Sequence, residues 1–428
     1  NFSFQPLTPF RPLPGIHIQL KSPIRGFSAN MDMLFSHLDH LAVSAVGGPR
    51  QANHTSAILL DCCQQDNRVS MDPLTQGALG ASLPQSASRK RHIAAAGMIG
   101  CLGGIAPDVD VFIRSDTDPL LFLEFHRQFT HSLLFIPIGG LIVGLILHGL
   151  LGQRWNLSPK LSIAFATLGY GTHALLDACT TYGTQLLWPF SEQRFSWSTV
   201  SVIDPAYTLP ILTLVLLAGY NKQPILARIA LAWALAYPAI GLIQRDRAIE
   251  VGRELATSRG LDPIRLEAKP TLANLLVWKI VCETDDYFYV DAVRVGMDTK
   301  IYSGDVVATL DIPRDLPWLD RGSQQARDLE RFSWFSNGYV AKDPVLPNRI
   351  IDVRYSVLPN EINALWSIEL IPSASAEIHV QYLTHRERSP ETMQKFRDMV
   401  FGRNATSKPI AADSSNSQQA PAKGLPSG

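Results

Sequence analysis

Ionisable side chains stand at the ends of several strongly apolar segments of this sequence. Six of them are imidazoles or carboxylates: Asp108, Asp110, His126, His131, His173 and Asp177. Charge at membrane depth is costly, so each is a candidate functional residue. Imidazole nitrogen and carboxylate oxygen suit zinc and similar divalent metals. The five cysteines contain no CxxC pair, so the residue types predict a metal site built from His and Asp.

The spacing of these residues limits how they can meet. His173 and Asp177 are four apart, so on a helix they share one face, with Cβ atoms about 6 Å apart, and can aim at one metal or at two adjacent ones. The HxxxD pattern also occurs by chance, and a buried His and Asp pair can be purely structural. His126 and His131 are five apart and would point to different faces of one helix. If both are ligands, one of them must lie in a loop.

All the polar groups are expected on one side of the membrane, together with a further one at Asp204. Helices alternate in direction, so unrelated groups would scatter over both sides. Individual alternatives stay open: Asp108 could end a helix, Asp110 could be solvated, and Thr130 could cap the next helix and leave His131 in its first turn. His148 lies in the opposite membrane half, where packing or an interhelical hydrogen bond is expected.

Five apolar segments predict an α-helical multi-pass membrane domain with about five spans. About 20 apolar residues cross a hydrocarbon layer of about 30 Å as a helix. The first predicted segment is short and rich in small residues, and the fourth is also short. The segments are 92–106, 132–151, 161–178, 207–220 and 225–243.

Basic residues in the connections predict the orientation. Lysine and arginine gather at 89–91, 154–160 and 222–228, which fall on one side and mark it as cytoplasmic. The candidate metal ligands then lie on the external side. The arginines at 245–253 follow the last span on that external side and disagree with the rule, which long trailing domains obey less strictly.

The composition divides the chain into four parts. Residues 1–70 predict an irregular extension outside the native core, with the native protein starting at Met71; a small metal site on their His and Cys residues is the alternative. Residues 71–243 form the membrane domain. Residues 244–403 predict a soluble α+β domain with a mostly antiparallel sheet, because β-rich runs alternate with turn residues before a last helix at 389–402. Residues 404–428 predict a disordered tail.

Several motifs of the membrane part resemble a known family. They are MDPLTQGALG (71–80), PDVD (107–110), HRQFTHSLLF (126–135), HALLDACTTYGTQLLWPFS (173–191) and VIDPAYT (202–208). They look like the YdjM-like family of predicted membrane-bound metal-dependent hydrolases of bacteria, and the resemblance runs from Met71 to about Ile243. That family is thought to be distantly similar to zinc-dependent phospholipase C, an all-helical hydrolase with His and Asp ligands and a recurring HxxxD motif.

The resemblance implies that the six residues named at the outset are metal ligands or their neighbours, in a multi-pass protein of the bacterial inner membrane. The site and the C-terminal domain would then be periplasmic. One departure matters: many family members have His where this chain has Gln76. Glutamine is a poor zinc ligand, so the site has one ligand fewer or Gln76 holds water or substrate.

We therefore expect a hydrolase with a bound divalent metal, for which zinc is favoured. Its expected substrate is an ester, with a phosphoester of a lipid or envelope precursor favoured. Asp108 or Asp110 could act as general base, and Arg127 or Arg194 could neutralise phosphate charge. The expected partners are the lipid bilayer and this substrate. Lysine plus arginine equal aspartate plus glutamate at 38 each, which argues against a nucleic-acid partner.

The alternative is a non-enzymatic membrane protein with a structural metal site and a periplasmic partner-binding domain. A structural site is closed by four protein ligands, whereas a catalytic site keeps one open position.

Overall fold

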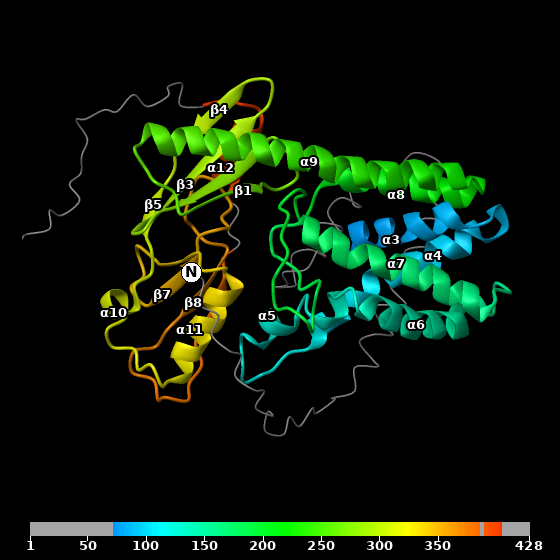
Figure 1. Ribbon diagram of the computed structural model, residues 1–428, viewed down its shortest axis with the longest axis horizontal. Helices are drawn as coiled ribbons and strands as arrows, with labels where there is room; N and C mark the ends of the chain where they lie inside the picture. Colours follow the sequence, from blue (N-terminus) through cyan, green and yellow to red (C-terminus); the bar gives the residue numbers. More distant parts are fainter. Residues whose placement is uncertain (1–71, 386–388, 405–428) are drawn as a thin grey trace, which may run out of the picture. The chain divides into compact units, whose positions relative to one another are not determined.

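The computed structural model describes residues 72–385 and 389–404. The expectations for the extension 1–70 and for the tail beyond Asn404 therefore lie outside the described residues. Six helices form the membrane part (Figure 1): α3 (Pro73–Ala87), α4 (Ile93–Ile105), α6 (Phe135–Leu147), α7 (Pro159–Cys179), α8 (Pro205–Asn221) and α9 (Pro224–Ser258).

Local sequence decides where these helices begin. Helices α3, α7, α8 and α9 each start with proline, whose missing N–H leaves no backbone bond unmade in the first turn. The preceding Asp72, Ser158 and Asp204 accept a hydrogen bond from a backbone N–H of the first turn and so cap three of these helices.

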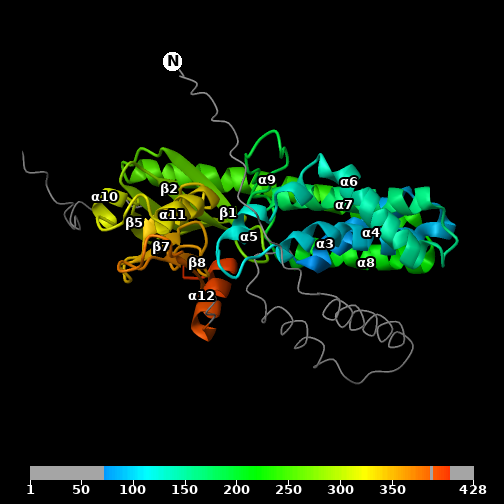
Figure 2. The same cartoon turned by 90° about the horizontal axis from the view of Figure 1, so that it is seen from below.

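Helix α3 was not predicted as a helix from the sequence. It forms an antiparallel hairpin with α4, and Figure 2 shows both beside α8. The two backbones touch at small residues: a Cβ atom added to Gly80 would lie 2.6 Å from the carbonyl oxygen of Gly100. Such close approach is typical of helices that associate in lipid.

Helix α7 packs as closely against α4. A Cβ atom on Gly169 would lie 2.1 Å from the carbonyl oxygen of Gly100, so only glycine allows this crossing. One turn further along, the same contact brings His173 against the carbonyl oxygen of Gly104, with 2.5 Å between Nδ1 and O. The packing of small residues thus positions a candidate ligand.

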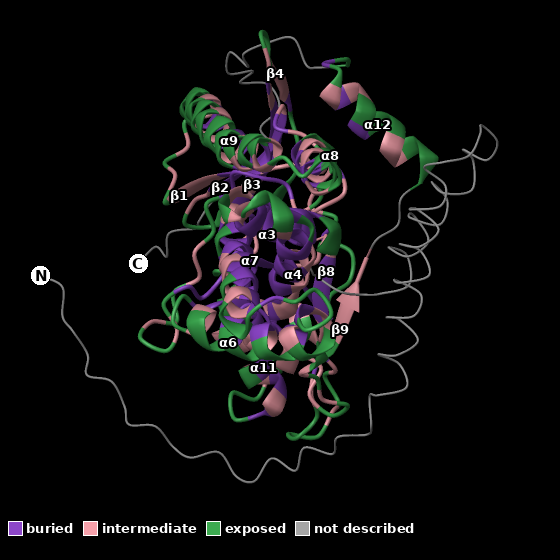
Figure 3. Cartoon of the chain, turned by 90° about the vertical axis from the view of Figure 1, so that its right-hand side faces the viewer, coloured by how far each residue is buried: buried purple, intermediate pink, exposed green. Residues whose placement is uncertain are grey.

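Three helical segments are long and apolar enough to cross a membrane: Lys90–Phe112, Phe135–Gly152 and Pro224–Ser258. The predicted count of about five is not confirmed, because α7 and α8 are not among these candidates. Figure 3 shows buried residues concentrated on α3, α4 and α7, while α6 is largely exposed. The exposed side chains of α6 are apolar, such as Leu145 and Ile146, which fits a lipid-facing surface.

Helix α9 continues from the membrane part into the soluble part. Its 35 residues cross the predicted domain boundary after Ile243 without a break. Its second half contains the charged residues that follow Ile243, and it packs against β1, β2 and β3.

The soluble part contains an antiparallel sheet domain, as predicted, but with two sheets. The first has the order β1-β2-β3-β4, with β5 paired to β3, and the second has the order β6-β7-β8-β9. The strands are β1 (Arg265–Pro270), β2 (Val277–Glu283), β3 (Tyr287–Val295), β4 (Thr299–Tyr302), β5 (Val306–Ala308), β6 (Val340–Lys342), β7 (Arg349–Asp352), β8 (Trp366–Glu369) and β9 (Gln381–Thr384). The short strands β1, β4 and β6 were not predicted.

Three helices complete this domain: α10 (Ile312–Asp315), α11 (Gln324–Phe335) and α12 (Pro390–Val400). Helix α12 was predicted and α11 was not.

Leu120 and Leu123, at the short helix α5 (Leu121–Phe125), pack into a core with Phe332 of α11. Tyr355 donates a hydrogen bond of 2.6 Å to the carbonyl oxygen of Thr181. The sheet domain thus holds the loops that lead into and out of the candidate site.

Candidate metal centre

Three side chains from three segments meet where α4 and α7 end. The ligand atoms of Asp108, His131 and His173 all lie within 4.8 Å of one another. Asp108 Oδ1 is 3.3 Å from His173 Nε2 and 3.6 Å from His131 Nε2, and the two Nε2 atoms are 2.9 Å apart. The sequence residues 108, 131 and 173 are therefore one cluster in space.

The protonation of His173 follows from its partner. Its Nδ1 faces the carbonyl oxygen of Gly104, which can only accept, so Nδ1 carries the hydrogen. In a neutral imidazole the other nitrogen, Nε2, then has a free lone pair.

His131 has the same tautomer for a different reason. Its Nδ1 lies 3.2 Å from Asp110 Oδ2 and 2.9 Å from Thr130 Oγ1, whose own hydroxyl donates to Asp110. Both neighbours thus accept from Nδ1, and Nε2 again has the lone pair. A carboxylate behind a histidine in this manner orients metal-ligating imidazoles and raises their basicity.

Two lone pairs 2.9 Å apart repel each other unless a cation lies between them or one ring gains a proton. Burial alone would lower the pKa of His131, but Asp110 and contacts with Asp108 and Asp177 hold that pKa well above its usual range. Protons and a metal ion therefore compete for the same position, and metal binding would release protons.

Asp177 closes the cluster from α7. Its Oδ2 is 3.4 Å from His131 Nε2, 3.9 Å from His173 Nε2 and 3.0 Å from Arg127 Nε, so the guanidinium competes for this oxygen. Gln76 Nε2 donates to the other oxygen, Oδ1, over 2.8 Å. Gln76 thus holds a candidate ligand in place.

Several buried polar atoms around this cluster have no hydrogen-bond partner. They are both carboxylate oxygens of Asp108, Oδ2 of Asp177, Oε1 of Gln76, and Nε and Nη2 of Arg127. Three of these atoms have ion-pair contacts: Arg127 Nε with Asp177 Oδ2 at 3.0 Å, and Asp108 Oδ1 with His173 Nε2 at 3.3 Å. Buried polar groups of native proteins are nearly always satisfied, so the remaining atoms, Asp108 Oδ2, Gln76 Oε1 and Arg127 Nη2, favour a bound ligand.

The distances between donor atoms fit a single divalent metal ion. Bonds of about 2.1 Å from nitrogen and oxygen to such an ion give donor separations of roughly 3.4 Å when four donors surround it. Five donor separations among Asp108, His131, His173 and Asp177 are 2.9, 3.3, 3.4, 3.6 and 3.9 Å. The residues therefore fit such an ion in type and in spacing.

Asp110 and His126 form a second group with Asp108 that could hold a metal. However, both Asp110 oxygens already accept hydrogen bonds, Oδ1 from His126 Nδ1 over 2.8 Å and Oδ2 from the Arg127 N–H and the Thr130 hydroxyl. This geometry makes Asp110 a positioning residue for His131. His126 in turn contacts Asp110 from the other side of the carboxylate.

The structure also answers the local alternatives. Thr130 does not cap α6, which begins only at Phe135; it lies with His131 in a 3₁₀ turn, Phe129–His131. His126 follows the end of α5, so neither histidine is on a continuous helix and their spacing of five is no obstacle. Asp204 caps α8 and accepts from Tyr237, outside the cluster. His148 contacts Ser162 across α6 and α7, the interhelical contact that we expected.

A third group of possible ligands lies in the sheet domain. Asp118, Asp328 and His379 approach one another, but Arg331 forms ion pairs with both carboxylates, at 2.8 Å and 2.9 Å. A guanidinium already neutralises this group, so it acts as an ion-pair network between α11 and the loop before α5.

Comparison with known proteins finds one family over the membrane part. Residues 71–248 match the family described as YdjM inner membrane protein. The predicted YdjM resemblance is thereby confirmed over that segment, and with the candidate spans it supports a membrane location. The further similarity to zinc-dependent phospholipase C is not shown.

One curated relative of the chain is an uncharacterised protein, YfhP of Bacillus subtilis (strain 168). It is 26% identical over 201 residues, which cover 46% of this chain and 59% of the relative. The chain thus spans about six tenths of the length of that relative. No solved structure matches the chain.

Proposed function

We propose that the YdjM segment is a membrane-bound metal-dependent hydrolase that cleaves an ester, with a phosphoester of a lipid or envelope precursor as the favoured substrate. One observation carries the proposal: the Nε2 atoms of His131 and His173 converge, 2.9 Å apart, beside the Asp108 carboxylate, whose oxygens have no hydrogen-bond partner. A bound divalent metal, with zinc favoured, would supply Lewis acidity and water activated near neutral pH.

Each neighbouring residue has a role in this scheme. His131, His173 and Asp108 would hold the metal and leave one position for water, while Asp177, whose Oδ2 is paired with Arg127, positions His131. The side chain of Asp108 is 12% exposed, whereas His131, His173 and Asp177 are fully buried. Water and substrate therefore enter past Asp108, whose second oxygen can accept a proton from the attacking water.

Arg127 supports a phosphoester over a neutral ester. It is only 1% exposed, and its Nη2 has no hydrogen-bond partner. A buried guanidinium beside a metal is suited to an anionic oxygen, because its fork matches phosphate geometry.

The surroundings of Asp108 favour an amphiphilic substrate. Val109 and Phe112, on either side of Asp110, are 58% and 69% exposed. Apolar side chains at the mouth of a site at the membrane boundary suit a lipid-like molecule better than a freely soluble one. The basic residues at the opposite helix ends favour a periplasmic site.

The test uses the full chain purified in detergent. His173→Ala and Asp177→Ala should each lower metal content and abolish release of phosphate from lipid phosphoesters, while membrane insertion is retained. His148→Ala, in the opposite half of the bundle, should keep both metal and activity. Unchanged metal content in both site variants would overturn the assignment.

The second candidate is a structural metal site without catalysis, favoured by the complete burial of His131 and His173. Cobalt substitution separates the two candidates. An open catalytic position should bind azide and change the visible spectrum, whereas a site closed by four protein ligands should not respond.

A further inference from the structure

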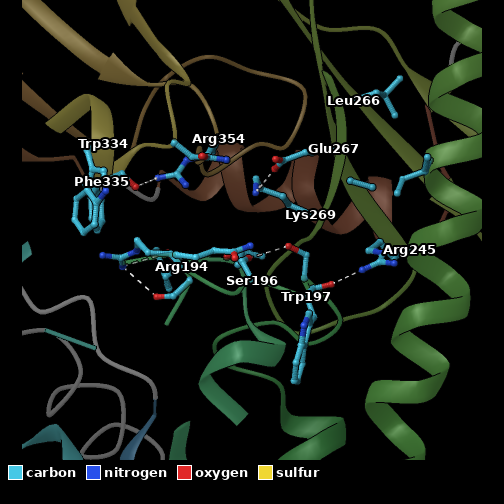
Figure 4. Close-up of a pocket in the computed structure, with 18 of the residues that line it drawn as sticks. Arg194, Ser196, Trp197, Arg245, Leu266, Glu267, Lys269, Trp334, Phe335 and Arg354 are labelled. Carbon is cyan, nitrogen blue, oxygen red and sulfur yellow. Dashed lines mark hydrogen bonds and ion pairs between the residues drawn. The ribbon is translucent and has the colours of Figure 1, made fainter. Parts of the chain in front are cut away.

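A cavity of about 490 Å³ lies between the loop that follows α7 and the sheet domain. Its size is in the range of small-molecule sites. Figure 4 shows charged side chains entering it from the loop, from α9, from β1 and from the chain after β7. The lining includes four cationic side chains and two carboxylates: Arg194, Arg245, Lys269 and Arg354, with Glu192 and Glu267.

Three of the four cations have carboxylate partners. Lys269 pairs with Glu267 over 2.7 Å, Arg354 with Asp352 over 2.6 Å, and Arg245 with its neighbour Asp246 over 2.8 Å. Their charges are therefore balanced within the protein.

Arg194 differs from these three. Among the described residues no carboxylate lies within ion-pair distance of its guanidinium, whose Nη atoms donate only to backbone carbonyl oxygens, those of Tyr182 at 3.3 Å and Gly183 at 3.1 Å being the nearest. Its Nε is buried without a hydrogen-bond partner. The guanidinium lies over the rings of Trp334 and Phe335, at 5.3 Å and 5.1 Å from their centres.

The charge of Arg194 is thus uncompensated in the free protein. Burial, and then the nearby guanidinium groups of Arg127 and Arg354, lower its pKa to about 9. A bound anion would supply the missing counter-charge, because a charge that is removed from water needs a partner.

We propose that this cavity binds a phosphate group through Arg194, and that the phosphate belongs to the headgroup of an anionic membrane lipid. The planar guanidinium can bind two phosphate oxygens, and the hydroxyl of Ser198, which also lines the cavity, can add a donor. This inference goes beyond the hydrolase proposal, since it does not require the metal centre to cleave anything.

Two observations favour a lipid over a soluble phosphate. Trp197 lines the cavity and is 41% exposed, and Phe190 on the same loop is 83% exposed. Aromatic side chains at this position are typical of the headgroup level of a membrane. The loop therefore places the cavity mouth where lipid headgroups lie.

The cavity is a neighbour of the metal centre and separate from it. Tyr182 lines the cavity, and Arg127 lies over its ring at 5.3 Å. The space between Arg127 and Arg194 holds only about 10 Å³, too little for a ligand. A phosphate in the cavity therefore does not touch the metal ligands.

The experiment measures binding by calorimetry to the full chain in a neutral detergent, with dihexanoyl phosphatidylglycerol and with inorganic phosphate as probes. Arg194→Gln should raise the Kd of the lipid at least about tenfold, because the substitution removes a charge-assisted contact. Arg321→Gln, an exposed arginine away from the cavity, should leave the Kd unchanged. His173→Ala should also leave it unchanged, which separates this proposal from the hydrolase proposal.

A second variant keeps the test decisive if Arg194→Gln does not fold. Glu192 is exposed and lines the cavity. Glu192→Gln removes a charge that repels the phosphate, so it should lower the Kd of phosphatidylglycerol by about two- to fivefold. Tighter binding of the lipid than of inorganic phosphate supports the headgroup, and equal binding identifies a soluble phosphate as the occupant instead. A Kd within twofold of the wild type in both variants overturns the site.

Discussion

Asp110 offers the most informative perturbation of the metal centre, because the geometry makes it a positioning residue behind His131. Its Oδ2 receives the Thr130 hydroxyl at 2.7 Å, the Arg127 N–H at 3.1 Å and His131 Nδ1 at 3.2 Å, while Oδ1 receives His126 Nδ1 at 2.8 Å. Asp110→Asn keeps the shape, removes the negative charge and leaves one carbonyl oxygen.

The expected loss follows from these contacts. Removal of a carboxylate behind a metal-ligating histidine typically costs about 10- to 100-fold in metal affinity, which equals about 1.4 to 2.8 kcal/mol. In Asp110→Asn the amide oxygen can retain the three contacts on the Oδ2 side, so we expect a loss near tenfold. Asp110→Ala removes all four contacts and should approach a hundredfold.

The assay is metal competition against a chelator, with the full chain in detergent at fixed pH, beside thermal unfolding. Asp204→Asn is the matched control: Asp204 is as buried as Asp110, at 2% exposure, but it caps α8 and accepts from Tyr237. Asparagine also caps helices well, so this control should change Tm little and metal Kd not at all.

The reasoning fails under either of two results. Metal affinity that is unchanged in Asp110→Asn would show that His131 is not oriented through Asp110. An equal loss in Asp204→Asn would show that any buried carboxylate of the bundle affects the metal through general destabilisation.

Three further expectations follow. Reporter fusions near Thr117 and Ser191 should both report the periplasmic side, and fusions that report opposite sides would exclude a single site. Burial lowers the pKa of Lys279 from its ordinary 10.5 to about 7. The unfolded chain then binds more protons between these values, so stability should rise from pH 7 towards 10.5, and Lys279→Met should flatten this rise in thermal melts; parallel curves would contradict it. Gly169→Ala should lower both Tm and metal content, because its Cβ would meet backbone at 2.1 Å, whereas Gly171→Ala, with the nearest atom at 3.5 Å, should be tolerated.

Local sequence was sufficient for the features that depend on neighbouring residues. Proline after a capping residue decided where α7 and α8 begin, and alternation of apolar residues located β2 and β3. Residue types alone indicated the candidate ligand set, since buried imidazole and carboxylate are rare in apolar surroundings. Helix α3 was not predicted because its Gly, Ala, Ser and Gln residues are buried by neighbouring helices and leave no amphipathic face.

The division of roles within the site was decided only by tertiary structure. His173 receives its tautomer from Gly104, 69 residues away, and Asp177 is held by Gln76, 101 residues away. The sequence makes Asp110 a candidate ligand, and only the packing shows that four donors surround its oxygens. A sequence pattern records which groups are near along the chain, whereas metal ligation depends on the direction of lone pairs, and contacts between distant segments determine that direction.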